Sequence, residues 1–135
     1  MATLAIGSTE GGGGRAASRG ITAESLGSRE FREDYGLKYA YLTGAMVKGI
    51  ASEALVVRIG RAGMMGFFGT GGLEPERIEE AIRRIQGALG EGRPYGMNLL
   101  YPFGNPRLEE RTVDLFLKHG VRTVEAAAYL QLSPG

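Results

Sequence analysis

Residues 64–90 read MMGFFGTGGLEPERIEEAIRRIQGALG and contain one strand-to-helix unit. An apolar run of strand length, residues 64–68, opens the unit. The glycine-rich loop 69–72 follows it, and a helical pattern fills the remainder. A buried strand, a loop and a helix in that order are the building block of a parallel α/β sheet.

The helical part of this unit has clear boundaries. Pro75 suits the first turn of a helix, because the amide that proline lacks has no partner there. Apolar residues then recur at spacings of three and four, which places on one helix face Ile78, Ile82, Ile85 and Leu89. Gly90 can end the helix in the left-handed conformation that side chains resist. We therefore predict an amphipathic helix over residues 75–89.

The same arrangement occurs on both sides of this unit. A strand at 39–42 and a helix at 52–62 precede it, and a strand at 95–100 and a helix at 106–119 follow it. Residues 121–128 supply a fourth apolar strand. Ser and Asn are favoured caps, and they stand before the two flanking helices. The alternation predicts an α/β fold with parallel strands.

Two architectures accept this alternation. One is a small doubly wound sheet, and the other is part of a TIM (β/α)₈ barrel, which usually needs about 250 residues. The chain has 135 residues, so a barrel interpretation requires that it hold only the first four βα units, a half-barrel. Alternation alone leaves both open.

Composition excludes several classes of function. The formal net charge is +1, without a basic cluster, which argues against nucleic acid as a partner. The chain contains no cysteine, so disulfides and thiolate metal sites are excluded, and we predict no metal site. No run of about eighteen apolar residues predicts a membrane span, and no signal-peptide core follows Met1, so we expect a cytoplasmic protein. Residues 1–24, with Gly11 to Gly14, predict a flexible glycine-rich leader before a domain at 25–135.

Four segments together resemble one family. They are DYGLKYAYLTGAMVKGIAS (34–52), GRAGMMGFFG (60–69), YGMNL (95–99) and GVRTVEAAAYL (120–130). In this order they resemble the opening half of the trans-acting, FMN-dependent enoyl reductases of polyketide and polyunsaturated fatty acid synthases. These enzymes are relatives of the nitronate monooxygenases. The resemblance implies the half-barrel and favours it over the doubly wound sheet.

The resemblance also implies FMN at the carboxyl ends of the strands, where active sites of such barrels lie. Gly44, Ala45 and Met46 would contact the flavin after the first strand, and Asn98 would contact it after the third. The alternatives are an ordinary turn with Met46 in the core, and an Asn98 that caps its own loop. The FMN phosphate would be held by later strands.

Other residues near the expected pocket are weaker candidates. The loop at Thr70 could border the flavin pocket or simply turn the chain, and it matches no phosphate-binding fingerprint. Glu125 and Tyr129 could orient substrate, or be an exposed carboxylate and a packing ring. His119 ends a helix, where a cation answers the helix dipole, so we assign it a structural role. The chain offers no identifiable catalytic residue.

The implied reaction is a hydride transfer. NADPH would reduce FMN, and the flavin would reduce an enoyl thioester carried on acyl carrier protein. The rivals are nitronate oxidation by the same flavin, and a non-catalytic half-barrel that pairs with a complementary half or with itself. We expect the isolated chain to be inactive, because the general acid would lie outside it.

Overall fold

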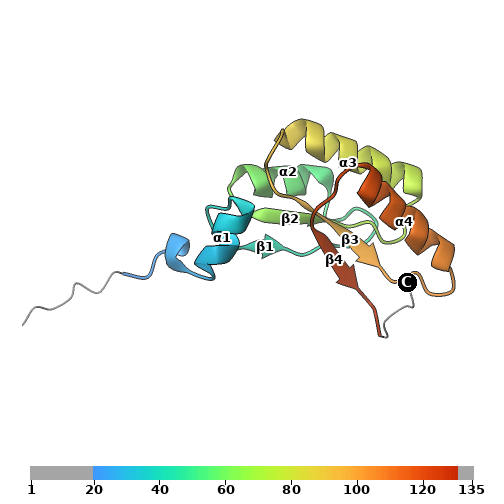
Figure 1. Cartoon of the computed structure of the whole chain (residues 1–135), viewed down its shortest axis with the longest axis horizontal. Coiled ribbons are helices and arrows are strands. Elements are labelled where there is room, and N and C mark those ends of the chain that lie inside the picture. The colour runs from blue at the N-terminus through green and yellow to red at the C-terminus, as the bar shows by residue number, and fades with distance from the viewer. Residues whose placement is uncertain (1–19, 131–135) are drawn as a thin grey trace, which may run out of the picture.

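The computed structural model describes residues 20–130, which form a parallel sheet with its three longest helices on one face (Figure 1). The strands are β1 (Leu42–Thr43), β2 (Met65–Phe68), β3 (Gly96–Leu100) and β4 (Val124–Ala127). The helices are η1 (Ala23–Ser25), α1 (Arg29–Tyr35), α2 (Glu53–Arg61), α3 (Pro75–Leu89) and α4 (Pro106–Lys118). Of the predicted leader, residues 1–19 lie outside the described residues, and η1 starts within its last part.

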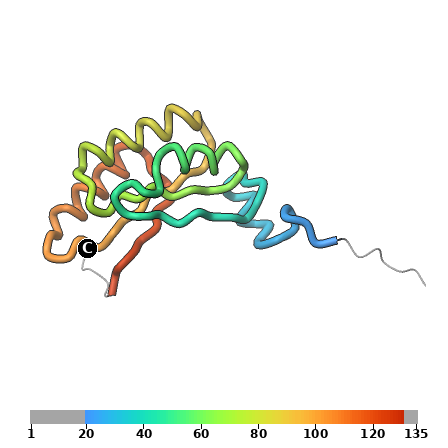
Figure 2. Tube along the Cα trace, turned by 180° about the vertical axis from the view of Figure 1, so that it is seen from behind, coloured from blue at the N-terminus to red at the C-terminus, as the bar shows by residue number. Residues whose placement is uncertain are grey.

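The order of the strands selects the architecture. All three pairings are parallel, and the order in the sheet is β1-β2-β3-β4. A doubly wound sheet reverses its strand order at a switch point, whereas a barrel adds each strand beside the previous one. In both views α2, α3 and α4 lie on the same face of the sheet (Figures 1 and 2). The described chain is therefore the predicted α/β half-barrel.

The register divides the strand residues between two faces. Paired residues of a parallel ladder point to the same side, and successive residues alternate. Phe68 pairs with Met97, and both side chains are buried under the helices. Asn98 pairs with Glu125, and both therefore lie on the opposite, inner face, which lines the interior in a closed barrel.

The main core lies between the sheet and the helices. Its fully buried side chains include those of Phe68, Ile82, Ile85, Met97 and Val56. The four apolar residues predicted to share a face of the 75–89 helix are all buried in this core. That prediction is confirmed.

A second, smaller core occupies the inner face. Leu37, Met65 and Phe67 are buried there, and Phe31 of α1 packs against them. Helix α1 was not predicted. Its sequence signal is nevertheless ordinary, because Ser28 caps it by accepting a hydrogen bond from Phe31 N at 3.1 Å, and a left-handed glycine ends it.

Two strands are shorter than predicted. The first was expected at 39–42 but comprises only Leu42–Thr43. The amides of Lys38 and Tyr39 both donate to Gly63 O, at 2.8 and 3.1 Å, so that segment forms a turn instead of a ladder. The fourth begins three residues late, because Val121 N still closes α4 by donating to Phe116 O.

Two predicted helix boundaries form differently. Asn105 precedes α4 but makes no side-chain capping hydrogen bond. Gly90 follows α3 with φ 75° and ψ −179°, so its φ is positive, as predicted, but its ψ is extended. Within the described residues, no helix is both long and apolar enough to cross a membrane.

Candidate functional site

The loops after β1 and β2 are joined through their backbones at the carboxyl ends of the strands. Lys48 N donates to Gly71 O at 2.7 Å, and Gly49 N donates to Gly69 O at 2.9 Å. In the reverse direction Gly69 N donates to Ala51 O at 3.2 Å. The two loops therefore form one hydrogen-bonded unit.

Gly69 is the point of closest approach between these loops. A side chain there would overlap the carbonyl group of Met46. Opposite it, Lys48 adopts a positive φ of 55°, an uncommon conformation for a residue other than glycine. Strain of this kind persists only where the surrounding structure imposes it, and it often marks functional regions.

The predicted segment 44–46 lies beside β4 across the inner face. Ala45 N donates to Glu125 Oε2 at 2.8 Å. A methyl group at Gly44 would meet nothing nearer than Glu125 Oε1, at 3.6 Å. Met46 is 45% exposed, so the alternative that places it in the core is wrong.

Asn98 connects β3 with β4 and is only 4% exposed. Its Nδ2 donates to Glu125 O at 3.0 Å, so it does not cap its own loop as the alternative proposed. No hydrogen bond to Asn98 Oδ1 forms within the described part of the chain. That oxygen is available to accept from a ligand.

Thr70 is buried and fastens the loop after β2 to β3. Its Oγ1 donates to Asn98 O at 2.6 Å. Thr70 also lines a cavity of about 250 Å³ together with Gly71, Tyr101 and Phe103. This cavity is also lined by residues of α3 and α4, so it lies on the helix-covered side of the sheet, and the prediction that the loop borders a flavin pocket stays a prediction.

Tyr129 lies apart from this network. Its hydroxyl donates to Glu109 Oε1 of α4 at 2.8 Å, and its ring packs against Tyr101. Burial, reinforced by the bond to Glu109, raises the pKa of Tyr129 to about 12. The structure thus brings together Gly44, Ala45, Thr70, Asn98 and Glu125, and it leaves Tyr129 in a separate aromatic cluster.

The contact between Glu125 and Ala45 was missed by the sequence analysis. The two residues are 80 positions apart, and no local pattern links them. A signal did exist, because a carboxylate within an apolar strand needs a partner. The identity of that partner depends on the curvature of the sheet.

His119 has the structural setting expected of it, at the C-cap of α4. Its Nε2 lies 2.8 Å from Glu79 Oε1, which also binds Lys118 at 2.9 Å and Arg83 at 2.7 Å. The hydrogen bonds from Lys118 and His119 lower the pKa of Glu79 to about 2. This cluster ties α3 to α4 on the outside of the half-barrel.

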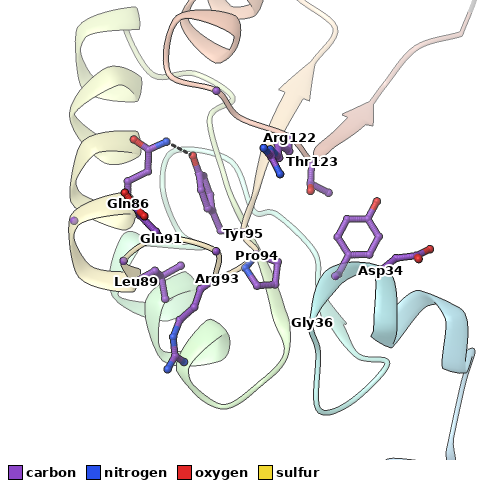
Figure 3. Close-up of a pocket in the computed structure, with 15 residues that line it drawn as sticks. Asp34, Gly36, Gln86, Leu89, Glu91, Arg93, Pro94, Tyr95, Arg122 and Thr123 are labelled. Carbon is purple, nitrogen blue, oxygen red and sulfur yellow. Dashed lines mark hydrogen bonds between the residues drawn. The ribbon is translucent and has the colours of Figure 1, made fainter.

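A cleft of about 840 Å³ lies at the opposite, amino ends of β3 and β4 (Figure 3). Its lining includes Arg122, Thr123 and the loop 90–94, and the hydrogen bond from Gln86 Nε2 to Tyr95 OH crosses one wall. Active sites of barrels lie at the carboxyl ends, and residues at the amino ends serve stability. We therefore place the candidate site at the bonded loops.

Comparison with known proteins gives a consistent result, although no family model matches. The chain is 56% identical over 115 residues to the polyketide biosynthesis protein PksE of Bacillus subtilis, covering 85% of this chain and 15% of PksE. It is 46% identical over 113 residues to one of the polyunsaturated fatty acid synthase proteins of Thraustochytrium sp., covering 84% of this chain and 8% of that protein. The chain thus spans less than a sixth of the length of these relatives.

A solved structure matches the fold as well as the sequence. The enoyl reductase domain of MlnA, from the macrolactin biosynthesis cluster of Bacillus amyloliquefaciens, superposes with a TM-score of 0.78 and 46% identity. The match covers 83% of this chain and 26% of that one. Together these matches confirm the resemblance drawn from the four sequence segments.

Proposed function

We propose that this chain forms one side of the flavin site of an enoyl reductase. The chain is homologous to one segment of polyketide and polyunsaturated fatty acid synthase proteins, and its fold is similar to part of an enoyl reductase domain. The observation that carries the proposal is the bonded network at the carboxyl ends. It joins Ala45, Thr70, Asn98 and Glu125.

The absence of a side chain at Gly44 would allow a flat ring to approach the backbone. The protein itself does not require glycine there, since a methyl group would make only an ordinary contact. Leaving that methyl out keeps the surface open to a planar ligand such as the isoalloxazine of FMN. The exposed Met46 side chain offers an apolar contact, and Asn98 Oδ1 offers a hydrogen-bond acceptor.

In the proposed reaction the cofactor supplies the hydride and the protein positions the cofactor. FMN, when bound and reduced by NADPH, would supply hydride to the β-carbon of an enoyl thioester on acyl carrier protein, and a proton from a group outside this chain would be added at the α-carbon. Gly44, Ala45 and Met46 would support the ring, and Asn98 would fix its orientation by accepting a hydrogen bond. Thr70 would hold Asn98 in place through its backbone oxygen. Rigid positioning of this kind is the main contribution of a protein to cofactor chemistry.

Flavin uptake tests the proposal directly. The 135-residue chain is titrated with FMN and binding is followed by quenching of flavin fluorescence and by equilibrium dialysis. We expect saturable binding, and an Asn98→Leu variant of similar volume should bind about tenfold more weakly, because it lacks both the amide oxygen and the hydrogen bond from Nδ2 to Glu125 O. Glu80→Ala, on the outer surface of α3, is the matched control and should bind FMN like the unmodified chain. A chain that takes up no FMN, either alone or supplemented with the remaining part of a homologous reductase, would contradict the proposal.

The rival within the same flavin chemistry is nitronate oxidation. Parallel assays with an enoyl thioester on acyl carrier protein plus NADPH, and with an alkyl nitronate plus oxygen, separate the two. They are run on this chain supplemented with the remaining part of a homologous reductase. Consumption of the thioester supports the enoyl reductase, and consumption of the nitronate supports the rival.

A further inference from the structure

Glu125 makes a contact across the half-barrel that the order of the strands does not predict. Its strand, β4, is three positions from β1 in the sheet, yet its Oε2 accepts from Ala45 N at 2.8 Å. Neighbouring strands are already joined by their ladders. The Glu125 carboxylate is therefore a link between the first and last strands of the sheet, made through a side chain.

The same residue also holds Asn98. The main-chain oxygen of Glu125 accepts from Asn98 Nδ2 at 3.0 Å, and the two residues pair in register between β3 and β4. One residue therefore contacts two separate parts of the candidate site. Its carboxylate orients the segment after β1, and its carbonyl orients the amide of Asn98.

The setting of the carboxylate is unfavourable in the absence of such a role. Glu125 is partly buried within an apolar strand, and no ion pair involves it within residues 20–130. A carboxylate withdrawn from water without a cation is costly, and hydrogen bonds must offset that cost. The bond to Ala45 N is the partner that the structure gives it.

We infer that Glu125 is a positioning residue, which fixes the distance between the Gly44–Met46 segment and Asn98 and thereby sets the affinity of the site for flavin. The inference rests on the proposed function and deepens it. Because the loop after β1 is bonded to the loop after β2, a shift at Ala45 would also reach Gly69. Loss of the carboxylate should therefore loosen the whole carboxyl edge of β1 and β2.

Three variants of the full chain test this inference: Glu125→Ala, Glu125→Gln and the control Glu80→Ala. Hydrogen exchange of the Ala45 amide, measured by NMR, reports the hydrogen bond itself. Exchange of the Ile82 and Ile85 amides, in the middle of α3, reports global unfolding. FMN affinity and the visible spectrum of bound FMN report the effect on the site.

We expect Glu125→Ala to accelerate Ala45 exchange about tenfold or more relative to the α3 amides, and to weaken FMN binding about tenfold. Glu125→Gln keeps an oxygen at the same reach, so it should restore part of both losses. Glu80→Ala should change neither. A residue that serves only global stability would instead accelerate all amides together.

Other outcomes overturn the inference or separate it from the proposed function. Unchanged Ala45 exchange in Glu125→Ala overturns it, and so does faster Ala45 exchange with unchanged FMN affinity. If the unmodified chain binds no FMN even when it is supplemented with the remaining part of a homologous reductase, the proposed flavin function fails. In that case the Ala45 exchange still decides whether Glu125 holds the segment after β1.

Discussion

At the scale of single residues, the candidate site contains two positions where the lack of a side chain is important. Gly69 has no side chain because the Met46 carbonyl occupies the space, and Gly44 has none although the protein leaves room for one. The first glycine is explained by the packing of the loops. The packing of the protein does not require the second.

Gly69→Ala tests the loop packing. The added methyl group must displace the Met46 carbonyl and with it the bonded loops, so the free energy of unfolding should fall by about 1–3 kcal/mol. Gly87→Ala in α3 is the control, because its added methyl group meets no neighbour and should stabilise the helix by about 1 kcal/mol. Urea denaturation measures both changes. Equal effects of the two substitutions would show that Gly69 is not in contact with the Met46 carbonyl.

At the scale of elements, the sequence predicts what local patterns control. The helix at 75–89 was predicted at its observed boundaries, because proline, apolar spacing and glycine all act locally. The strand at 39–42 was misplaced, because its start depends on Gly63, which lies more than twenty residues away in the chain. The same limit applies to the site. Asn98 could be identified from its position near the end of a strand. The contact between Glu125 and Ala45 could not, because it depends on how the sheet curves.

The contact of Glu79 with Lys118 and His119, between α3 and α4, should make the free energy of unfolding depend on pH in the acid range. In the folded protein Lys118 and His119 hold the pKa of Glu79 at about 2, below its ordinary value of 4.5. The stabilisation is therefore fully present above about pH 4.5 and is lost as the pH falls toward 2. Glu79 and His119 are partly exposed, and Lys118 is largely exposed, so solvent and salt screen the interaction and its effect on stability should be small.

Glu79→Gln isolates this effect. The variant should be less stable than the unmodified chain at pH 6, and the difference should shrink as the pH is lowered to about 2.5. Urea denaturation at a series of pH values provides the measurement. A difference that stays constant over this range would exclude a role for the charge of Glu79.

At the scale of the whole molecule, the sheet has two unpaired edges within residues 20–130. β1 pairs only with β2, β4 pairs only with β3, and Leu42 and Val124 on these strands are 47% and 43% exposed. Unpaired strand edges attract further strands. We propose that a complementary half-barrel or a second copy of this chain pairs there.

Light scattering during size-exclusion chromatography tests this pairing. The chain alone, of 14.4 kDa, should elute with a larger mass that rises with concentration. Val124→Lys should shift it toward the monomer, because a charge on an edge strand opposes pairing. Addition of a homologous fragment with the remaining strands should give a one-to-one complex. A monomer under all these conditions would contradict the proposal.

The sequential order of the strands also has a consequence for biosynthesis. Each strand pairs with the one made just before it, so the sheet can grow on the ribosome one βα unit at a time. Contacts between near neighbours in the chain also favour rapid folding. The bond from Ala45 to Glu125 is the exception, because it must wait until 80 further residues have been translated. The segment that we assign to the flavin is therefore made early but becomes fixed only after the fourth strand has been synthesised.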